Sequence, residues 1–487
     1  MNAGVVSLVI LSASVSLLAG CASGPDFVRP APISEVTYTA VPMSGQVGTD
    51  AIGKGGVQQF HLGEVVDARW WRRLGSSRLD AYIEGAFLAS PTLAAAAATL
   101  RQAEEIRMAQ AAVRTYPGIH AGVSAQRQRM NPGMLGIAGN PREFSLYTAG
   151  LEIRHRLDLS GGTRRTLEAL TARVDHRYHE MENARLRLAA GITLTAIRRA
   201  SLADQSRATL AILDVQIEQE KLVGGQVLIG LASEEEMLAL RVRTEQTRAT
   251  LHQLQRQIEQ EDHTLAMLAG RAPGSAAVPA FNLGEFLLPG DLPVVLPSAL
   301  ARHRPDIQAA EALLHAANAE YGVAISKLYP QVNLSATLGS QGMNMDSLFG
   351  GGAAIWSVIG QLTQPLLNPG LPAERRASLA ALEAASMNYQ AVVLDALREV
   401  ADAMRAAHHD AEILTSFEEA SGAASRALEL VERQHAIGTA SHPRVLAAKE
   451  HALQQEGLVT AARAQRLADT VVLFQVLGGG YGDSREI

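Results

Sequence analysis

The chain has 487 residues, of which 4% are aromatic and 19% charged, with a formal net charge of −6; its length suggests two to four domains. A slightly acidic chain lacks the basic excess of a general nucleic-acid binder, so we expect no nucleic acid among its partners. The abundance of Ala, Leu, Arg, Glu and Gln favours long helices over a β-sandwich or a doubly wound sheet.

The amino terminus has the pattern of an export signal. The apolar run Val5–Leu18 is too short to span a membrane and leads into Leu-Ala-Gly-Cys21, so residues 1–20 are predicted to be a signal peptide. The n-region MNAGVVS carries no Lys or Arg, which leaves the true start codon open. Leu-Ala-Gly-Cys resembles the bacterial lipobox. That resemblance implies that Cys21 carries diacylglycerol and an N-acyl chain; the alternative is a lone thiol near a cleaved signal.

An extended arm is expected next, over residues 21–75, because residues 22–66 are rich in Pro, Gly, Thr and Ser and show no steady period. A first repeat, residues 76–270, then opens with two helices, about Ser76–Ala89 and from Pro91 to near Tyr116.

Two strands follow in this repeat, at about 117–128 and 144–158. The first begins at Tyr116-Pro117 and alternates cleanly between apolar and polar residues. In the second, the alternation changes parity near Thr148–Gly150, which predicts a bulge or a bend.

A pair of long helices, 162–269, completes the first repeat. Its first helix reaches about Val223, roughly 90 Å at 1.5 Å per residue, and the segment from Gly224-Gly225 to Gly230 is expected to break it. Its second helix runs back over about 233–269. Residues 271–296, rich in Gly, Pro and Ala, are predicted to be an equatorial linker between the repeats.

The second repeat, residues 297–480, copies the first. The stretch Leu296–Gly339 is expected to be one long helix that passes through Tyr329-Pro330 into a strand, and Pro330 lies 213 positions after Pro117. Strands at about 330–340 and 353–364 and a helix pair at 373–477 follow, with residues 481–487 as a C-terminal tail.

Four strands of about ten residues have the length of membrane-crossing strands. Four strands cannot close into a barrel, and an open sheet edge is not viable in lipid, so the chain must oligomerise through its strands. Two copies would supply eight strands and three copies twelve. The long helices are charged throughout, which indicates a soluble, coiled-coil-like wall. A ring of strands that continues into a helical tube is a conduit.

The chain resembles the TolC/OprM-like outer-membrane factors of the NodT-type lipoprotein branch. The residues that carry the resemblance are Leu296–Gly339, Gln364–Gly370, Leu394–Ala403, Leu477–Gly480 and Leu18–Pro30. The resemblance implies a mixed, mostly α fold: a homotrimer with a twelve-stranded outer-membrane β-barrel, in contact with outer-membrane lipid, on a periplasmic α-barrel of twelve helices.

The same resemblance implies a passive, lipid-anchored exit duct that takes drugs or other small toxic molecules from an inner-membrane proton-driven pump and a periplasmic adaptor. It is not expected to be an enzyme or to hold a cofactor other than the lipid. No GxxxxGK[ST] motif for ATP hydrolysis is present. The transported substrate and the particular pump and adaptor are not determined by the sequence.

By the same resemblance, a gate is expected at the periplasmic tip, in the turns of the two helix pairs. The second turn of relatives carries an acid where this chain has Ala447, which leaves His442 and Arg444 as the polar candidates. The first turn carries Glu234, Glu235 and Glu236. Our hypothesis is that Arg444 pairs with Glu236 or a neighbour across adjacent turns. The alternative is a solvated Glu run at a helix N-terminus, where the macrodipole favours acids.

Other functions stay open on the residues alone. The family resemblance also allows type I protein secretion or metal export. A structural coiled-coil lipoprotein of the envelope is a further alternative, although it has no use for half-apolar strands. A metal enzyme would need a site such as His176, His179 and Glu180, which we interpret instead as a solvated helix face.

Overall fold

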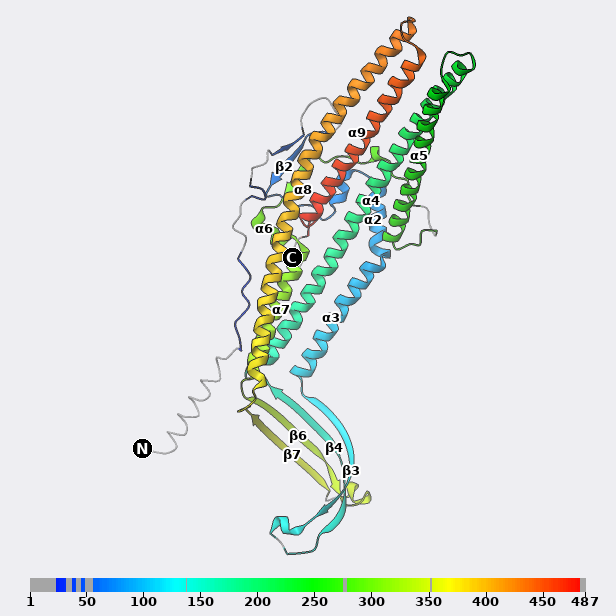
Figure 1. The fold of residues 1–487 in the computed structure, drawn as a ribbon. Helices are drawn as coiled ribbons and strands as arrows, with labels where there is room; N and C mark the ends of the chain where they lie inside the picture. The colour runs from blue at the N-terminus through cyan, green and yellow to red at the C-terminus, as the bar shows by residue number, and fades with distance from the viewer. Residues whose placement is uncertain are drawn as a thin grey trace. The chain divides into compact units, whose positions relative to one another are not determined.

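The computed structural model describes residues 23–31, 37–40, 45–48, 56–136, 138–274, 278–350 and 353–481 (Figure 1). Cys21 and the predicted signal peptide lie outside the described residues, as does the C-terminal tail after Tyr481. The chain divides into two compact units, each of which draws segments from both sequence repeats. Unit 1 is formed from Met1–Arg29, Thr99–Arg177 and Ala310–Tyr389, and unit 2 from Pro30–Ala98, Tyr178–Ala309 and Gln390–Ile487.

The sheet of unit 1 has four antiparallel strands in the order β3-β4-β6-β7, and Figure 1 shows it strongly curved. Their bounds lie within two residues of those expected: β3 (Gly118–Met130), β4 (Arg142–Leu157), β6 (Gln331–Gly342) and β7 (Ala354–Thr363). The period-2 pattern locates these strands because one face of each is apolar.

Of the bulge or bend expected near Thr148–Gly150, the bulge is wrong, because β4 pairs without interruption with both of its neighbours. Instead, Gly122, Gly150 and Gly339 face one another across three strands. A Cβ atom on Gly339 would lie 2.4 Å from the carbonyl oxygen of Ala149, so the backbones approach too closely for a side chain. The change of pattern in β4 therefore reflects a row of glycines and not an extra residue.

Both helix-to-strand joints fall at the Tyr-Pro pairs. Helix α3 (Pro91–Thr115) ends one residue before Tyr116-Pro117, and α7 (Pro305–Ser326) ends shortly before Tyr329-Pro330. The prediction of one helix from Leu296 to Tyr329 is wrong, because α6 (Pro297–His303) stops at Arg304, which has extended backbone angles. Pro305 causes this break, since a proline disfavours helical geometry at the preceding residue.

Four long helices carry most of the remaining chain: α4 (Gly162–Leu228), α5 (Glu234–Leu268), α8 (Gly370–Ala436) and α9 (His442–Val476). The break falls within the expected segment Gly224–Gly230, but later than Val223, because α4 continues through Gly224-Gly225 to Leu228. The chain turns away from the helix at Gly230, whose φ of 70° allows the amide of Leu231 to reach back to the carbonyl of Gln226. Glycine weakens a helix without necessarily ending it.

Unit 2 also contains a small sheet that the sequence pattern did not reveal. Strand β1 (Gln46–Val47) pairs antiparallel with β2 (Gln58–Leu62), which pairs parallel with β5 (Asp291–Val294). The arm and the linker are therefore joined by backbone hydrogen bonds instead of running separately. Strands this short give no readable period, and β2 and β5 lie more than 200 residues apart in the sequence.

Helix α2 (Ser77–Ala89) belongs to unit 2 and packs near the buried Trp70 and Trp71. Trp71 donates a hydrogen bond from Nε1 to Asp80 at 2.9 Å. Within the described residues, no single helix has the length and apolar composition to cross a membrane; α2 and α3 meet that test only together, as a bent pair.

Candidate channel wall and gate

One face of the four-stranded sheet is apolar across all four strands. The register aligns Ile119, Ile153, Ala336 and Val358 in one row, and Ala121, Leu151, Leu338 and Trp356 in the next. In the single chain all of these residues except the half-buried Ala336 are exposed, with 71% of Val358 and 76% of Trp356 accessible. An exposed apolar face on strands of bilayer length is suited to contact with lipid tails.

The opposite face of the sheet is polar. His120, Glu152, Thr337 and Ser357 form the row directly beside the apolar ones, on the other side of the pleat. Arg154 donates hydrogen bonds to Glu152 at 2.6 and 2.9 Å, and the Thr337 and Ser357 hydroxyls lie 2.5 Å apart. Charged and hydroxyl groups on this face are suited to a water-filled interior.

The two outer strands of this sheet are edges. In the described structure β3 pairs with β4 and β7 pairs with β6, so each presents its other side without a strand partner. Backbone N–H and C=O groups that meet lipid without partners cost several kcal/mol each. A membrane-inserted sheet of this kind must therefore complete its edges with other copies of the chain.

The Tyr-Pro joints of both repeats lie at one end of this sheet, and Tyr116 and Tyr329 are 69% and 41% exposed in the single chain. Pro117 and Pro330 directly precede Gly118 and Gln331, the first residues of β3 and β6. Because proline cannot donate the next helical hydrogen bond, each joint changes from helix to strand at a defined residue.

The first candidate gate turn lies between α4 and α5. Ser233 caps α5 by accepting a hydrogen bond from the amide of Glu236 at 3.1 Å, and Glu234, Glu235 and Glu236 occupy the first turn as exposed residues. This is the position where the helix macrodipole stabilises acids. The position of the three carboxylates at the N-terminus of α5 therefore accounts for their presence without a contact to another chain.

The second candidate turn lies between α8 and α9, where Gly438 adopts a φ of 77°. His442 Nε2 lies 2.9 Å from Glu218 Oε1, so this turn is linked to α4. Arg444 and Ala447 are exposed on α9. The structure thus gives His442 a partner on α4, and the pairing of Arg444 with an adjacent turn stays a prediction.

A buried carboxylate that the sequence reading missed lies one turn from Ala447. Glu450 on α9 is 3% exposed, and its Oε1 accepts hydrogen bonds from Gln216 on α4 at 2.8 Å and from Arg243 on α5 at 2.7 Å. Gln454 adds a further contact at 3.3 Å. One side chain therefore connects three helices near the candidate gate.

A signal for this residue was present in the sequence. Glu450 lies four positions after the buried Leu446, and residues four apart share one face of a helix. An acid on the apolar stripe of α9 is unusual enough to predict a buried partner. The partners themselves lie more than 200 residues away and could not be assigned by spacing.

Residues from α4, α5 and α9 line a groove of about 360 Å³ at this level, among them Glu236, Ala447 and Glu450. The structure thus places Glu236 and Ala447 beside the same opening. Among the described residues, no group of three or more His, Cys, Asp or Glu side chains is arranged to hold a metal ion. His179, part of the motif considered for a metal, lies 2.6 Å from the Tyr481 hydroxyl through Nδ1.

Comparisons with known proteins agree with this arrangement. The family model of the outer membrane efflux proteins matches residues 83–271 and 296–479. The chain is 29% identical to outer membrane protein OprJ of Pseudomonas aeruginosa, covering 76% of this chain and 78% of OprJ. It is 28% identical to the probable efflux pump outer membrane protein TtgC of Pseudomonas putida, covering 98% and 96% of the two chains.

Solved structures share the fold. The outer-membrane channel OprN superimposes with a TM-score of 0.81 and 26% identity, over 94% of this chain and 99% of that one. The Campylobacter jejuni outer membrane channel CmeC gives a TM-score of 0.82 at 19% identity, over 95% and 96% of the two chains. The predicted fold class, mostly helical with a four-stranded sheet and two repeats, is confirmed.

Proposed function

Because the chain belongs to the outer membrane efflux protein family, we propose that three copies of it form the exit duct of a tripartite efflux system. The chain is an efflux channel of the bacterial outer membrane, with a periplasmic extension. Conduction is passive. The energy comes from an inner-membrane proton-driven pump, which a periplasmic adaptor connects to the duct.

The observation that carries the proposal is the register of the sheet. It gathers the apolar side chains of four strands on one face and leaves β3 and β7 as edges. Pairing β7 of one copy with β3 of the next satisfies both edges, and three copies supply twelve strands, enough for a closed barrel with an aqueous interior.

The names of relatives suggest the class of cargo. Two proteins of Pseudomonas putida, each 28% identical to this chain, are named an antibiotic efflux pump outer membrane protein and a toluene efflux pump outer membrane protein. We propose small toxic molecules of this kind as the cargo. Relatives named for pyoverdine export show that other small molecules are an alternative.

Lipid attachment at Cys21 is part of the proposal. It rests on the lipobox resemblance of Leu18–Cys21, and the lipid would fix the amino terminus in the membrane. Mass spectrometry of the mature amino terminus tests it directly.

Reconstitution into planar lipid bilayers tests the duct. The purified protein should give discrete conductance steps and should migrate in SDS gels as an oligomer that heating converts to monomer. Migration as a monomer without any conductance would contradict the duct and favour a structural envelope protein.

The gate hypothesis is tested at Arg444. We propose that Arg444 pairs with Glu236 of a neighbouring copy and helps to hold the tip closed. An exposed pair contributes only about 0–1 kcal/mol, so three equivalent pairs would bias the closed state without locking it. Arg444→Ala should raise the closed-state conductance in bilayers. Arg256→Ala, an exposed arginine further along α5, is the matched control. Equal closed-state conductance in the parent and Arg444→Ala would refute the pairing.

A further inference from the structure

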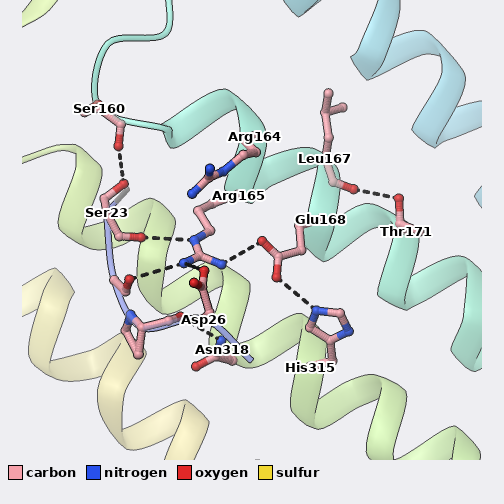
Figure 2. Close-up of polar contacts among 12 residues, drawn as sticks. Ser23, Asp26, Ser160, Arg164, Arg165, Leu167, Glu168, Thr171, His315 and Asn318 are labelled. Atoms are coloured by element: carbon pink, nitrogen blue, oxygen red, sulfur yellow. Dashed lines mark hydrogen bonds and ion pairs between the residues drawn. The ribbon is translucent and has the colours of Figure 1, made fainter. Parts of the chain in front are cut away.

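Arg165, near the start of α4, is buried although it is a charged residue. It is 2% exposed, and every hydrogen bond described for its guanidinium goes to oxygen (Figure 2). Nε donates to the carbonyl of Ser23 at 3.1 Å, and Nη2 donates to the carbonyl of Gly24 at 3.2 Å and to Asp26 at 2.7 Å. Nη1 donates to Glu168 at 2.8 Å. Three of these four acceptors belong to the amino-terminal segment.

The backbone of the same segment is bonded to other elements of unit 1. Both the amide and the hydroxyl of Ser23 donate to the carbonyl of Ser160, at 3.2 and 2.5 Å (Figure 2). Asn318 on α7 donates to the carbonyl of Pro25 at 3.1 Å. The segment is therefore held on two sides by groups that recognise its main chain.

Side chains of the segment also have defined partners. Phe27 stacks on His315 with ring centroids 4.3 Å apart and planes 14° from parallel. His315 in turn lies 2.9 Å from Glu168, the acid that holds Arg165. Arg29 forms an ion pair with Glu311 at 2.6 Å. These contacts extend the docked region over Ser23–Arg29.

Two glycines allow this segment to approach α7. Gly24 has a φ of 81°, and a Cβ atom on it would lie 2.8 Å from the Cα of Gly322. A Cβ atom on Gly322 would lie 2.8 Å from the carbonyl oxygen of Ser23 and 2.9 Å from Cγ of Arg165. Gly322 is inside a helix, where glycine is unfavourable, so its presence there is explained by the docked segment.

The second repeat provides an internal comparison. Arg375-Arg376 near the start of α8 matches Arg164-Arg165 near the start of α4, yet Arg376 is exposed. The chain has one amino-terminal segment and two such positions. Burial of Arg165 therefore comes from the docked segment and not from the repeated helix itself.

From these contacts we propose that Arg165 is the central residue of a receptor for Ser23–Arg29, and that this receptor positions the lipid-bearing Cys21 where β4 passes into α4. Ser160, which holds Ser23, lies between the end of β4 at Leu157 and the start of α4 at Gly162. Two peptide units span at most about 7 Å, so a lipid on Cys21 is tethered within that reach of Ser23.

The inference rests on the proposed lipid attachment, and it adds a function for the arginine. A lipid fixed beside the end of a membrane strand holds the chain at the level where its sheet enters the bilayer. A lipid on a free tether would permit many orientations, so docking the segment reduces the conformational entropy to be lost on insertion.

A spin label tests the receptor itself. Val28 is 82% exposed within the docked segment, and Val28→Cys supplies a single free thiol when the sulfur of Cys21 carries lipid. In the parent and in Arg376→Gln, the nitroxide should report restricted motion. In Arg165→Gln its rotational correlation time should fall several-fold, because the segment loses three of its acceptor contacts. Equal mobility in all three proteins would overturn the receptor.

Gly322→Ala is a second variant, which distinguishes loss of docking from a folding defect of Arg165→Gln. Alanine is the better helix former, yet its methyl group displaces the carbonyl of Ser23. The label should become mobile in this variant while the helical circular dichroism is unchanged. Restricted motion in Gly322→Ala would also count against the docked segment.

The positioning role is tested by assembly in the outer membrane after pulse labelling. Arg165→Gln should form the heat-modifiable oligomer several-fold more slowly than Arg376→Gln. In protein exported through a non-lipoprotein signal with Cys21→Ala, Arg165→Gln should cause no further delay. A delay that persists without the lipid would show that Arg165 is merely structural. Lack of lipid mass on Cys21 of the parent would instead overturn the lipid attachment.

Discussion

At the scale of single residues, two carboxyl groups meet in a buried part of unit 2. Asp469 on α9 is 6% exposed, and its Oδ1 accepts a hydrogen bond from Gln465 at 2.9 Å, while Oδ2 is buried among the described residues without a hydrogen-bond partner. Burial raises the pKa of Asp469 to about 7, the neighbouring carboxyl group of Asp410 on α8 adds to this rise, and Gln465 and Arg466 oppose it. Asp469 therefore holds a proton in the folded protein under conditions in which it is ionised in the unfolded chain.

The sign of the pH dependence follows from this raised pKa. The folded state binds more protons than the unfolded state between the ordinary carboxyl value of 3.8 and about 7. The contribution to stability is complete below that interval and is lost as the pH rises through it. We expect the midpoint temperature of thermal unfolding to decrease as the pH rises from about 4 to about 7. In Asp469→Asn this decrease with pH should be smaller. Identical slopes, measured by circular dichroism, would contradict the assignment.

At the scale of the elements, contacts between helices fix an arrangement that the apolar and polar faces of each single helix do not predict. Glu450 joins α4, α5 and α9, although each of these helices can be predicted without it. A buried carboxylate that loses a charged donor keeps its desolvation cost. The cluster therefore stabilises one arrangement of the helix pairs near the candidate gate.

Arg243→Leu should lower the free energy of unfolding by about 1–3 kcal/mol, because it leaves Glu450 buried with neutral donors. Arg241→Leu, an exposed arginine on the same helix, should have little effect. Chemical denaturation in detergent measures both. Equal losses in the two variants would show that Glu450 does not depend on Arg243.

The row of glycines in the sheet gives a second prediction at this scale. Gly339→Ala places a methyl group against the carbonyl of Ala149, so it should reduce the fraction of heat-modifiable oligomer. Gly122→Ala, in the same row, meets no atom within 4 Å in the chain and should assemble normally. Gel migration with and without heating compares the variants, and normal assembly of Gly339→Ala would rule out the close approach.

At the scale of the whole molecule, the two faces of the sheet must meet different solvents. Val358 and Ile359 are neighbours on β7, yet Val358 belongs to the apolar face and Ile359 to the polar face. Their exposed fractions, 71% and 55%, do not separate them in the single chain. Their positions in the closed assembly distinguish them, because one face of the sheet contacts lipid and the other lines the interior of the channel.

Val358→Arg should therefore impair insertion into the membrane, since arginine on the lipid face costs about 2–4 kcal/mol near the bilayer midplane. Ile359→Arg should insert and change the ion selectivity of the channel. Outer-membrane fractionation and bilayer reversal potentials measure the two effects. Insertion of Val358→Arg together with failure of Ile359→Arg would mean that the faces are reversed.

Much of the architecture was readable in the sequence because its determinants are local. A period of two marked four strands to within two residues, and Tyr116-Pro117 and Tyr329-Pro330 marked both joints. Where a local signal was weak, prediction was less exact: Pro305 split a helix that had been expected to be continuous, and α4 continued five residues past Val223 to Leu228.

By itself, the sequence determined the long helices, the four strands of the large sheet and their repetition, since these depend on neighbouring residues. Only the tertiary structure decided which strands share a face, why Gly150 stands opposite Gly339, and why Arg165 and Glu450 are buried. These features join residues more than 100 positions apart, and no period or cap specifies such pairs. They depend on close packing and on the need of each buried polar group for a partner.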